Sequence, residues 1–254
     1  MISKNELKYY SSLLKKKFRD KENKFLIEGE KIVREGIQSE YNCEIIFVTK
    51  QFVEENKKII SKLQNGKFRL EILSNSDFSK LTDTVNPQGI AAVINHPVSK
   101  RKIDSDLVVC LDNISDPGNL GTIIRNCDWF GIRDLVLVNN CADPYNPKAI
   151  RSSMGSIFHL NIFTEFEFEK DFKKLFALGY KLIFTDTKGE DIDSFSFTGK
   201  IIITFSNEAN GPSENIKSLS QTRITIPRIG KAESLNVASA SAVILDHLTK
   251  KKIK

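Results

Sequence analysis

Three polar segments of the chain, each directly after an apolar run, carry the side chains best suited to chemistry. The first holds Asn119 and Arg125, the second holds Glu208, and the third holds Ser234 and Asn236. Amides and hydroxyls can bind a substrate, and an arginine can stabilise negative charge that develops in a transition state. Each apolar run predicts a buried strand, and open parallel sheets bind ligands at the carboxyl ends of their strands. The three segments therefore predict one composite site.

The first segment has the signals of a strand, a turn and a helix. Residues 107–110 are apolar, and Asp-Pro-Gly at 116–118 marks a turn. Apolar residues then recur at helical spacing, which predicts a helix that begins near Asn119 and carries Arg125 about one and a half turns later. An ordinary strand-to-helix connection with a capping asparagine would have the same pattern.

Several familiar active sites are absent from the sequence. No two glycines are separated by a single residue, which excludes the Gly-x-Gly-x-x-Gly dinucleotide loop, and no Gly-Lys is followed by Ser or Thr, which excludes the P-loop. There is no Gly-x-Ser-x-Gly nucleophile elbow. The histidines, His96, His159 and His247, are scattered, so we interpret them as structural or surface residues.

The composition of the chain restricts the cellular compartment and the binding partners that we expect for the protein. The 254 residues carry a formal net charge of +6, which suits a polyanion without specifying one. The four cysteines include no Cys-x-x-Cys pair, which favours free thiols over disulfides or zinc. The first residues lack an apolar signal core, and no apolar run has membrane-spanning length. We therefore expect a cytoplasmic protein without a metal or a membrane partner.

The first hundred residues predict a small α/β domain. No catalytic group of residues is recognisable there, which suits a domain that binds a substrate. The expected strands are 25–27, 45–48, 68–72 and 89–94, and the expected helices are 7–18, 30–37, 52–63 and 76–81.

A basic cluster lies near the N-terminus of this domain. It consists of Lys15, Lys16, Lys17 and Arg19, at the end of the helix expected over 7–18. One interpretation is that the helix dipole favours cations at its C-terminus. The other is a patch that contacts the phosphates of a nucleic acid.

Residues after position 97 change character. Pro97, Ser99 and the basic residues that follow predict a linker over 98–106, between a domain of residues 1–97 and a second domain of residues 107–254. Strands alternate with helices in the second domain, which predicts an α/β fold with a mostly parallel sheet. The expected strands are 107–110, 135–138, 159–162, 181–185, 201–205 and 222–226, and the expected helices start near 119, 147, 168 and 235.

Three motifs resemble those of one enzyme family. Residues 116–125 (Asp-Pro-Gly-Asn-Leu-Gly-Thr-Ile-Ile-Arg) are similar to the first motif of the SpoU/TrmH family of RNA ribose 2′-O-methyltransferases. Residues 207–211 (Asn-Glu-Ala-Asn-Gly) are similar to the second motif, and residues 226–227 with 234–238 to the third. The resemblance spans about residues 105–250, and the first hundred residues resemble the family's substrate-binding domain more loosely.

The resemblance implies a fold, a cofactor and an assembly. The family's α/β domain contains a C-terminal trefoil knot that binds S-adenosylmethionine, mainly through backbone groups, and a homodimer completes the active site. Two positions depart from the family pattern, since Ser206 stands where glycine is usual and Arg228 where methionine is common. The implied cofactor contacts are Ser206, Ile226, Leu235, Thr185, Asn207 and Gly211.

The resemblance also assigns roles to the polar residues. Arg125 activates or positions the ribose hydroxyl; because arginine stays protonated, a clamp on phosphate or on alkoxide charge suits it better than a base. Asn119, Ser234 and Asn236 would bind ribose, cofactor or Arg125, and Glu208 would orient a loop or pair with Arg125. The 2′-hydroxyl implies RNA, with ribosomal RNA as the expected substrate and Lys15, Lys16, Lys17 and Arg19 as RNA contacts.

Other functions fit parts of the same pattern. A methyltransferase acting on transfer RNA would share all three motifs. A catalytically silent RNA-binding protein would keep the fold and lose motif residues, whereas Arg125, Glu208, Ser234 and Asn236 are all present. A small-molecule α/β enzyme would lack salt-sensitive binding to RNA.

Overall fold

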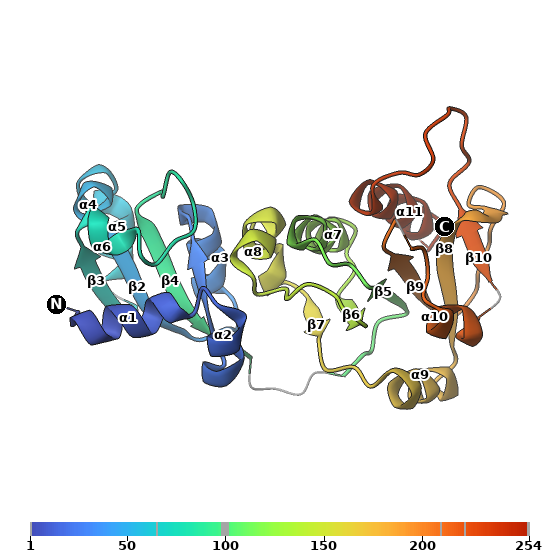
Figure 1. The fold of residues 1–254 in the computed structure, drawn as a ribbon, viewed down its shortest axis with the longest axis horizontal. Coiled ribbons are helices and arrows are strands. Elements are labelled where there is room, and N and C mark those ends of the chain that lie inside the picture. Colours follow the sequence, from blue (N-terminus) through green and yellow to red (C-terminus); the bar gives the residue numbers. More distant parts are fainter. Residues whose placement is uncertain (1, 65, 98–101, 209, 221, 253–254) are drawn as a thin grey trace. The chain divides into compact units, whose positions relative to one another are not determined.

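The chain forms two compact units. The structure, a computed structural model, describes residues 2–64, 66–97, 102–208, 210–220 and 222–252. Unit 1 consists of Met1–Lys100 and Tyr145–Phe158, and unit 2 of Arg101–Pro144 and His159–Lys254 (Figure 1). The functional division into residues 1–97, 98–106 and 107–254 stays a prediction, and residues 98–101 of the expected linker lie outside the described part.

Unit 1 is built on a four-stranded sheet with the order β1-β4-β2-β3. Strand β4 is antiparallel to both β1 and β2, and β2 is parallel to β3. The strands are β1 (Lys24–Glu28), β2 (Cys43–Thr49), β3 (Arg69–Leu73) and β4 (Ile90–Asn95). The helices are α1 (Lys4–Ser12), α2 (Lys16–Glu22), α3 (Glu30–Gln38), α4 (Lys50–Glu55), α5 (Lys57–Leu63), α6 (Asn75–Phe78) and α8 (Pro147–Ser153), followed by the 3-10 helix η1 (Ser156–Phe158).

The segment 145–158 belongs to unit 1 because its aromatic residues complete a core there. The ring centroid of Tyr145 lies 4.7 Å from that of Phe25, and the centroid of Phe158 lies 5.2 Å from that of Tyr41. Gly155 has a φ of +100°, and a Cβ there would lie 2.7 Å from Cγ of Glu35, so the chain needs glycine at this position. The helix expected near 147 is confirmed, but its place in unit 1 was not predicted.

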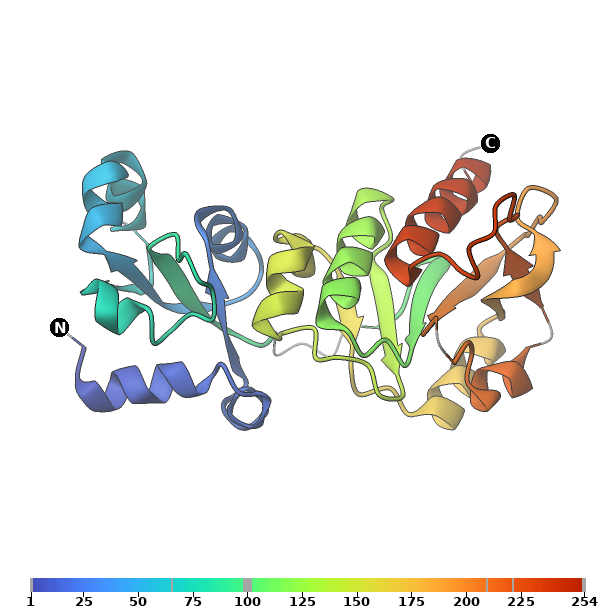
Figure 2. The ribbon, with the colours of Figure 1, turned by 45° about the horizontal axis from the view of Figure 1, so that its top comes forward.

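Unit 2 contains a six-stranded sheet with the order β10-β8-β9-β5-β6-β7. Every neighbouring pair is parallel, which confirms the predicted sheet. Its strands are β5 (Leu107–Asp112), β6 (Asp134–Val138), β7 (Asn161–Phe163), β8 (Tyr180–Asp191), β9 (Lys200–Ser206) and β10 (Arg223–Thr225). Its helices are α7 (Pro117–Trp129), α9 (Phe168–Ala177), α10 (Glu214–Leu219) and α11 (Val237–Lys252), and α7 and α11 lie side by side (Figure 2).

Two helix predictions were wrong in their bounds, and one helix was not predicted at all. The single helix expected over 7–18 is two helices, because α1 ends at Ser12 and α2 begins at Lys16. The helix expected over 52–63 is interrupted at Asn56, which has a φ of −123° and a ψ of 41°. Helix α10 lies in a stretch with no expected element. Local side-chain hydrogen bonds set these ends, and apolar spacing does not reveal them.

All four cysteines are free thiols. Burial raises the pKa of Cys43 to about 12 and that of Cys141 to about 11, so both thiols are protonated at neutral pH. Within the described residues, no helix combines the length and apolar composition that a membrane span requires. In the same part of the chain, His, Cys, Asp and Glu side chains form no group of three that could hold a metal ion.

Candidate active site

The polar segments follow strands that end at the same edge of the unit 2 sheet. Ser206, the last residue of β9, lies opposite Asp112, the last residue of β5. Phe184 of β8 lies opposite Thr204 of β9, so Thr185 is at the same edge. Ile226 follows the end of β10 directly. The parallel arrangement therefore gathers these segments, as the sequence predicted.

Strand β8 leaves its ladder with β10 at this edge. Arg223 pairs with Phe184, but the next residue, Ile224, pairs with Glu190, so residues 185–189 lie outside the ladder. A Cβ on Gly189 would lie 2.8 Å from the carbonyl oxygen of Arg223, so only glycine allows this close approach. The excursion begins with Thr185, one of the predicted cofactor contacts.

Helix α7 begins two residues before the predicted start. Its N-cap is Asp116, whose Oδ1 accepts a hydrogen bond from the backbone N–H of Asn119 at 2.8 Å. The alternative interpretation, in which Asn119 only caps this helix, is therefore wrong. Because Asn119 lies in the first turn, its side chain is available elsewhere, and its Oδ1 accepts a hydrogen bond from Nδ2 of Asn236 at 3.0 Å.

Asn236 and Glu208 together hold the start of helix α11. Oδ1 of Asn236 accepts hydrogen bonds from the backbone N–H of Ala238 at 3.0 Å and of Ser239 at 3.4 Å. Oε1 of Glu208 accepts from the backbone N–H of Val237 at 2.7 Å. Four N–H groups at a helix N-terminus lack partners within the helix, so these side chains satisfy several of them. Glu208 thus orients the loop and does not pair with Arg125.

Arg125 lies on α7 next to a second connection between α7 and α11. Nδ2 of Asn126 donates to the carbonyl oxygen of Ala238 at 2.8 Å and to Oγ of Ser241 at 2.9 Å. Arg125 itself is exposed. Among the residues that the structure describes, neither Arg125 nor Ser234 has a hydrogen-bond partner, so both are free to bind a ligand.

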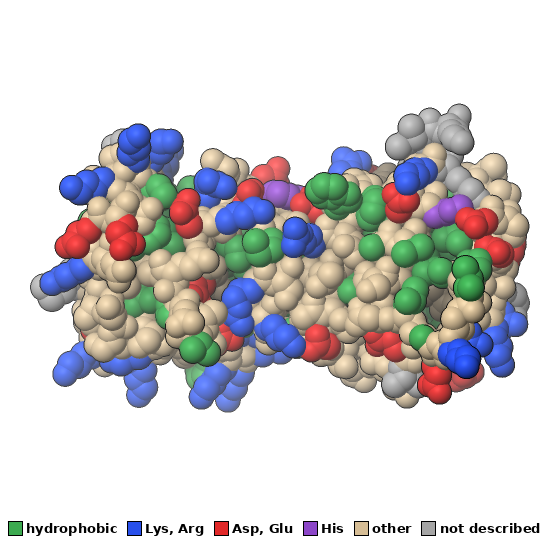
Figure 3. Space-filling model, turned by 90° about the horizontal axis from the view of Figure 1, so that it is seen from above, with side chains coloured by type: hydrophobic (Ala, Val, Ile, Leu, Met, Phe, Trp, Pro, Cys, Tyr) green, Lys and Arg blue, Asp and Glu red, His purple; other side chains and the backbone are tan. Residues whose placement is uncertain are grey.

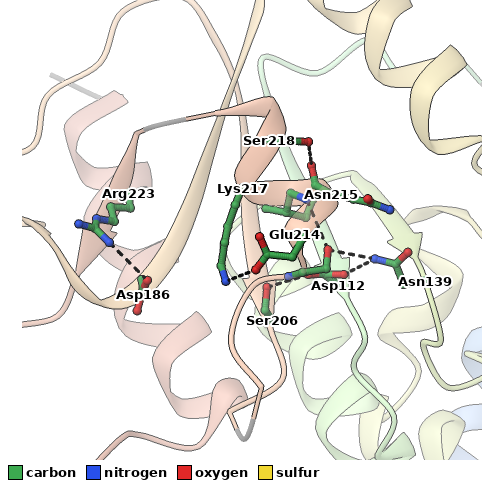
Figure 4. A network of polar contacts seen from close by, with 11 residues as sticks. Asp112, Asn139, Asp186, Ser206, Glu214, Asn215, Lys217, Ser218 and Arg223 are labelled. Carbon is green, nitrogen blue, oxygen red and sulfur yellow. Dashed lines mark hydrogen bonds and ion pairs between the residues drawn. The ribbon is translucent and has the colours of Figure 1, made fainter.

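A buried carboxylate, Asp112, connects the segments of this edge (Figure 4), and the sequence patterns did not single it out. Its Oδ2 accepts hydrogen bonds from Oγ of Ser206 at 3.3 Å and from the backbone N–H of Ser213 at 2.7 Å. Its Oδ1 accepts from Nδ2 of Asn139, the residue after β6. The available signal was a single aspartate that ends a wholly apolar strand.

The predicted cofactor residues differ in their surroundings. Ser206 is buried, and its hydroxyl is occupied by Asp112. The backbone N–H of Gly211 donates to the carbonyl oxygen of Asn207 at 2.9 Å, and Gly211 has a φ of +63°. Thr185 and Ile226 are half-buried, whereas Leu235 is 49% exposed. Ala209, within the second motif, lies outside the described residues.

The basic cluster of unit 1 separates into two parts. Lys15, Lys16 and Lys17 are exposed, and they lie at the start of α2, where the helix dipole disfavours cations. The interpretation that a helix C-terminus favours the cluster is therefore wrong for the three lysines, although Arg19 lies in the last turn of α2 and donates to the C-cap residue of α1. Arg19 is only 2% exposed. Its Nη1 donates to the carbonyl oxygens of Leu13 at 3.0 Å and Leu14 at 2.8 Å, so its role is structural and the expected RNA contact at Arg19 is wrong.

Comparison with protein families gives two matches. Residues 106–246 match the SpoU rRNA Methylase family. Residues 4–92 match the MRM3-like substrate binding domain.

Individual relatives cover nearly the whole chain. A Bacillus subtilis protein named 23S rRNA (guanosine(2553)-2'-O)-methyltransferase RlmP is 34% identical over 248 residues, which are 97% of each chain. A TrmH-family structure from Porphyromonas gingivalis has a TM-score of 0.85 at 28% identity, with 97% of this chain and 98% of that chain covered. The SpoU methyltransferase AviRb of Streptomyces viridochromogenes, solved with AdoMet, has a TM-score of 0.87 at 24% identity over 99% of each chain, a likeness of fold alone.

Proposed function

This chain belongs to the SpoU rRNA methylase family, and from that premise we propose that it transfers a methyl group from S-adenosylmethionine to a ribose 2′-hydroxyl of ribosomal RNA. The observation that carries the proposal is the meeting of the motifs in space. Asn119 of the first motif bonds Asn236 of the third, and Glu208 of the second bonds Val237 of the third. Residues more than a hundred positions apart thus form one site.

The residues at the sheet edge fit S-adenosylmethionine. Thr185 within β8, Ser206 at the end of β9 and Ile226 directly after β10 lie at one edge of the sheet. Apart from its chain neighbours, no described residue has an atom within 4 Å of the Cβ position of Gly211, which leaves room beside the backbone. Leu235, half-exposed, offers an apolar surface on the opposite loop. These residues would hold the cofactor mainly by their main chain, and when bound it supplies an activated methyl group.

The protein's own contribution is to place the hydroxyl and stabilise charge. Arg125 is exposed, so its guanidinium can bind the target phosphate or the oxygen that loses its proton. Asn119 and Asn236 hold α7 against α11, which fixes the backbone that carries Arg125. Ser234, with no described partner, can donate to the ribose or to the cofactor. Alignment of this kind can supply a large part of the acceleration, because the transfer needs no covalent intermediate with the protein.

Methyl transfer with tritiated S-adenosylmethionine tests the proposed function. The purified protein is incubated with 23S rRNA, 16S rRNA or transfer RNA, and the product is hydrolysed in alkali. Because a 2′-O-methyl group blocks cleavage of the adjacent phosphodiester, we expect the label in alkali-stable dinucleotides from rRNA. Label in mononucleotides would show base methylation and contradict the reaction, and label confined to transfer RNA would contradict the substrate.

We propose further that the protein is a cytoplasmic homodimer with a knotted C-terminal segment. Four of the exposed large apolar residues lie on α7, on α11 or in the loop before α11: Trp129, Ile229, Leu235 and Val243. Hydrophobic side chains gather on the face that α7 and α11 present (Figure 3). Exposed apolar residues so close to a site suit a second copy of the chain that covers them. The four free thiols suit a reducing compartment.

Substitution of Trp129 by glutamate tests the dimer. Trp129 is 83% exposed, and a charge there would be buried in the proposed interface at a large cost. We expect wild type to sediment as a dimer at micromolar concentration and Trp129→Glu as a monomer. Leu178→Glu is the matched control, since Leu178 is 59% exposed on the same unit but follows α9. A monomeric wild type, or equal loss of dimer in both variants, would contradict the interface.

A further inference from the structure

We propose that Asp112 is a positioning residue of the cofactor site, holding residues 206–208 and 210–213, the described part of the loop at the end of β9, in the geometry that binds S-adenosylmethionine. The inference rests on the proposed function and adds to it a residue outside the three motifs. Asp112 acts through Ser206, Asn207 and Ser213, each of which contacts it.

The carboxylate of Asp112 is buried, and both of its oxygens accept hydrogen bonds. Asp112 has no exposed surface, and a buried charge is stable only where hydrogen bonds satisfy it. Three donors do so, from Ser206, Ser213 and Asn139. They come from three separate segments, so the carboxylate joins the ends of β5 and β9, the loop after β6 and the start of α10. Charge-assisted bonds of this kind are stronger than neutral ones.

The main chain of Asp112 holds the same loop at a second point. Its carbonyl oxygen accepts a hydrogen bond from the backbone N–H of Asn207 at 3.3 Å. The carbonyl oxygen of Asn207 in turn accepts from the N–H of Gly211. Asp112 thus fixes the loop at its first residues through Ser206 and Asn207, and at its last through Ser213. The predicted contacts Ser206, Asn207 and Gly211 all lie between these points.

The side chain of Ser206 supplies one of the three donors to Asp112. A glycine, which the family pattern usually has here, could not donate a side-chain hydrogen bond to Asp112. Asn139 closes the network from the other side, because its Nδ2 also lies 3.4 Å from Oγ of Ser213. Asn139 has a φ of +55°, a conformation that glycine adopts without strain.

A second buried aspartate provides a matched control. Asp134 also has no exposed surface, and it begins β6, at the opposite edge of the same sheet. Its Oδ2 accepts from the N–H of Asp104 at 3.2 Å and from the N–H and Oγ of Ser105 at 3.0 and 2.6 Å. Its Oδ1 accepts from Nδ2 of Asn161 at 2.8 Å. Amide substitution of either aspartate therefore disturbs a comparable buried network, but only Asp112 lies beside the cofactor loop.

The test compares Asp112→Asn with Asp134→Asn in the full chain. Asp112→Asn replaces one acceptor oxygen by an amide N–H group, which then faces another hydrogen-bond donor. The hydrogen bond at that oxygen is lost, and part of the loop is released. Calorimetric titration with S-adenosylhomocysteine should give a dissociation constant at least tenfold higher for Asp112→Asn and within threefold of wild type for Asp134→Asn. Hydrogen exchange of residues 206–213 should be faster only in Asp112→Asn. Unchanged affinity in Asp112→Asn, or equal weakening in both variants, would overturn the inference.

A second, less disruptive variant tests the inference if Asp112→Asn does not fold. Asn139→Gly removes one donor at an exposed residue and keeps the backbone conformation, so the affinity should fall severalfold at an unchanged melting temperature. Unchanged affinity in Asn139→Gly would then overturn the inference. A wild-type protein that fails to bind S-adenosylhomocysteine would overturn the proposed function itself. Wild-type binding with unaffected variants would overturn only the role of Asp112.

Discussion

Replacement of Arg125 by alanine is expected to lower the rate of methyl transfer to RNA by about 10²–10³-fold, the usual effect of removing one group that stabilises transition-state charge. Arg125 is exposed on α7, beside the bonds that join α7 to α11. Its side chain has no described partner to lose, so the fold should be unaffected. Binding of S-adenosylhomocysteine should also stay within threefold of wild type, because the predicted cofactor contacts lie on other segments.

Arg133→Ala is the control for this experiment. Arg133 is also an exposed arginine of unit 2, but it lies just before β6, at the other edge of the sheet. Its Nη2 lies 3.7 Å from Oδ1 of Asp104. Arg125→Lys should recover only part of the rate, because lysine keeps the charge and loses the planar fork. A rate in Arg125→Ala within threefold of wild type would remove Arg125 from the active site.

Substitution of Arg19 by methionine is expected to lower the free energy of unfolding by about 2–4 kcal/mol, since it leaves buried carbonyl groups without donors. The guanidinium of Arg19 donates to the carbonyl oxygens of Leu13 and Leu14, which follow the end of α1. Methionine has an unbranched side chain that occupies much of the same space, so the decrease in the free energy of unfolding comes mainly from the lost hydrogen bonds. Urea unfolding followed by circular dichroism measures it.

The three lysines beside Arg19 should behave in the opposite way. Replacement of Lys15, Lys16 and Lys17 together by glutamine should leave the unfolding free energy within about 0.5 kcal/mol, as for most surface changes. Binding to RNA should weaken, and the slope of log K against log salt should become shallower by about 2, if each lysine contacts one phosphate. Equal losses of stability in this variant and in Arg19→Met would contradict the division of the cluster.

Sequence patterns predicted the layers of the fold well because burial sets them. The apolar run at 107–110 and the almost wholly apolar run at 201–205 became the central strands β5 and β9, which parallel sheets bury on both faces. The polar residues after these runs necessarily reached one edge. The resemblance to the SpoU/TrmH family added the function, which no periodicity contains.

Contacts between distant side chains could not be predicted in the same way. Glu208 was expected to orient a loop or pair with Arg125, and only the folded chain shows it bonded to the N–H of Val237. Arg19 resembles its basic neighbours in sequence, yet the break between α1 and α2 turns it inward. Asp112 was overlooked for a related reason: its partners come from β9, from α10 and from the loop after β6, and spacing along the chain does not bring these together.

The segment of residues 145–158 has a consequence for dissection of the gene. Unit 1 is discontinuous, since this segment comes from the middle of the downstream half. A truncation at the linker would therefore not yield two autonomous modules. The upstream fragment would lose the rings that cover Phe25 and Tyr41. The downstream fragment would carry Tyr145 and Phe158 without the core against which they pack, which would favour aggregation. A chimaera that exchanges unit 1 with that of a relative would similarly have to exchange both stretches at once.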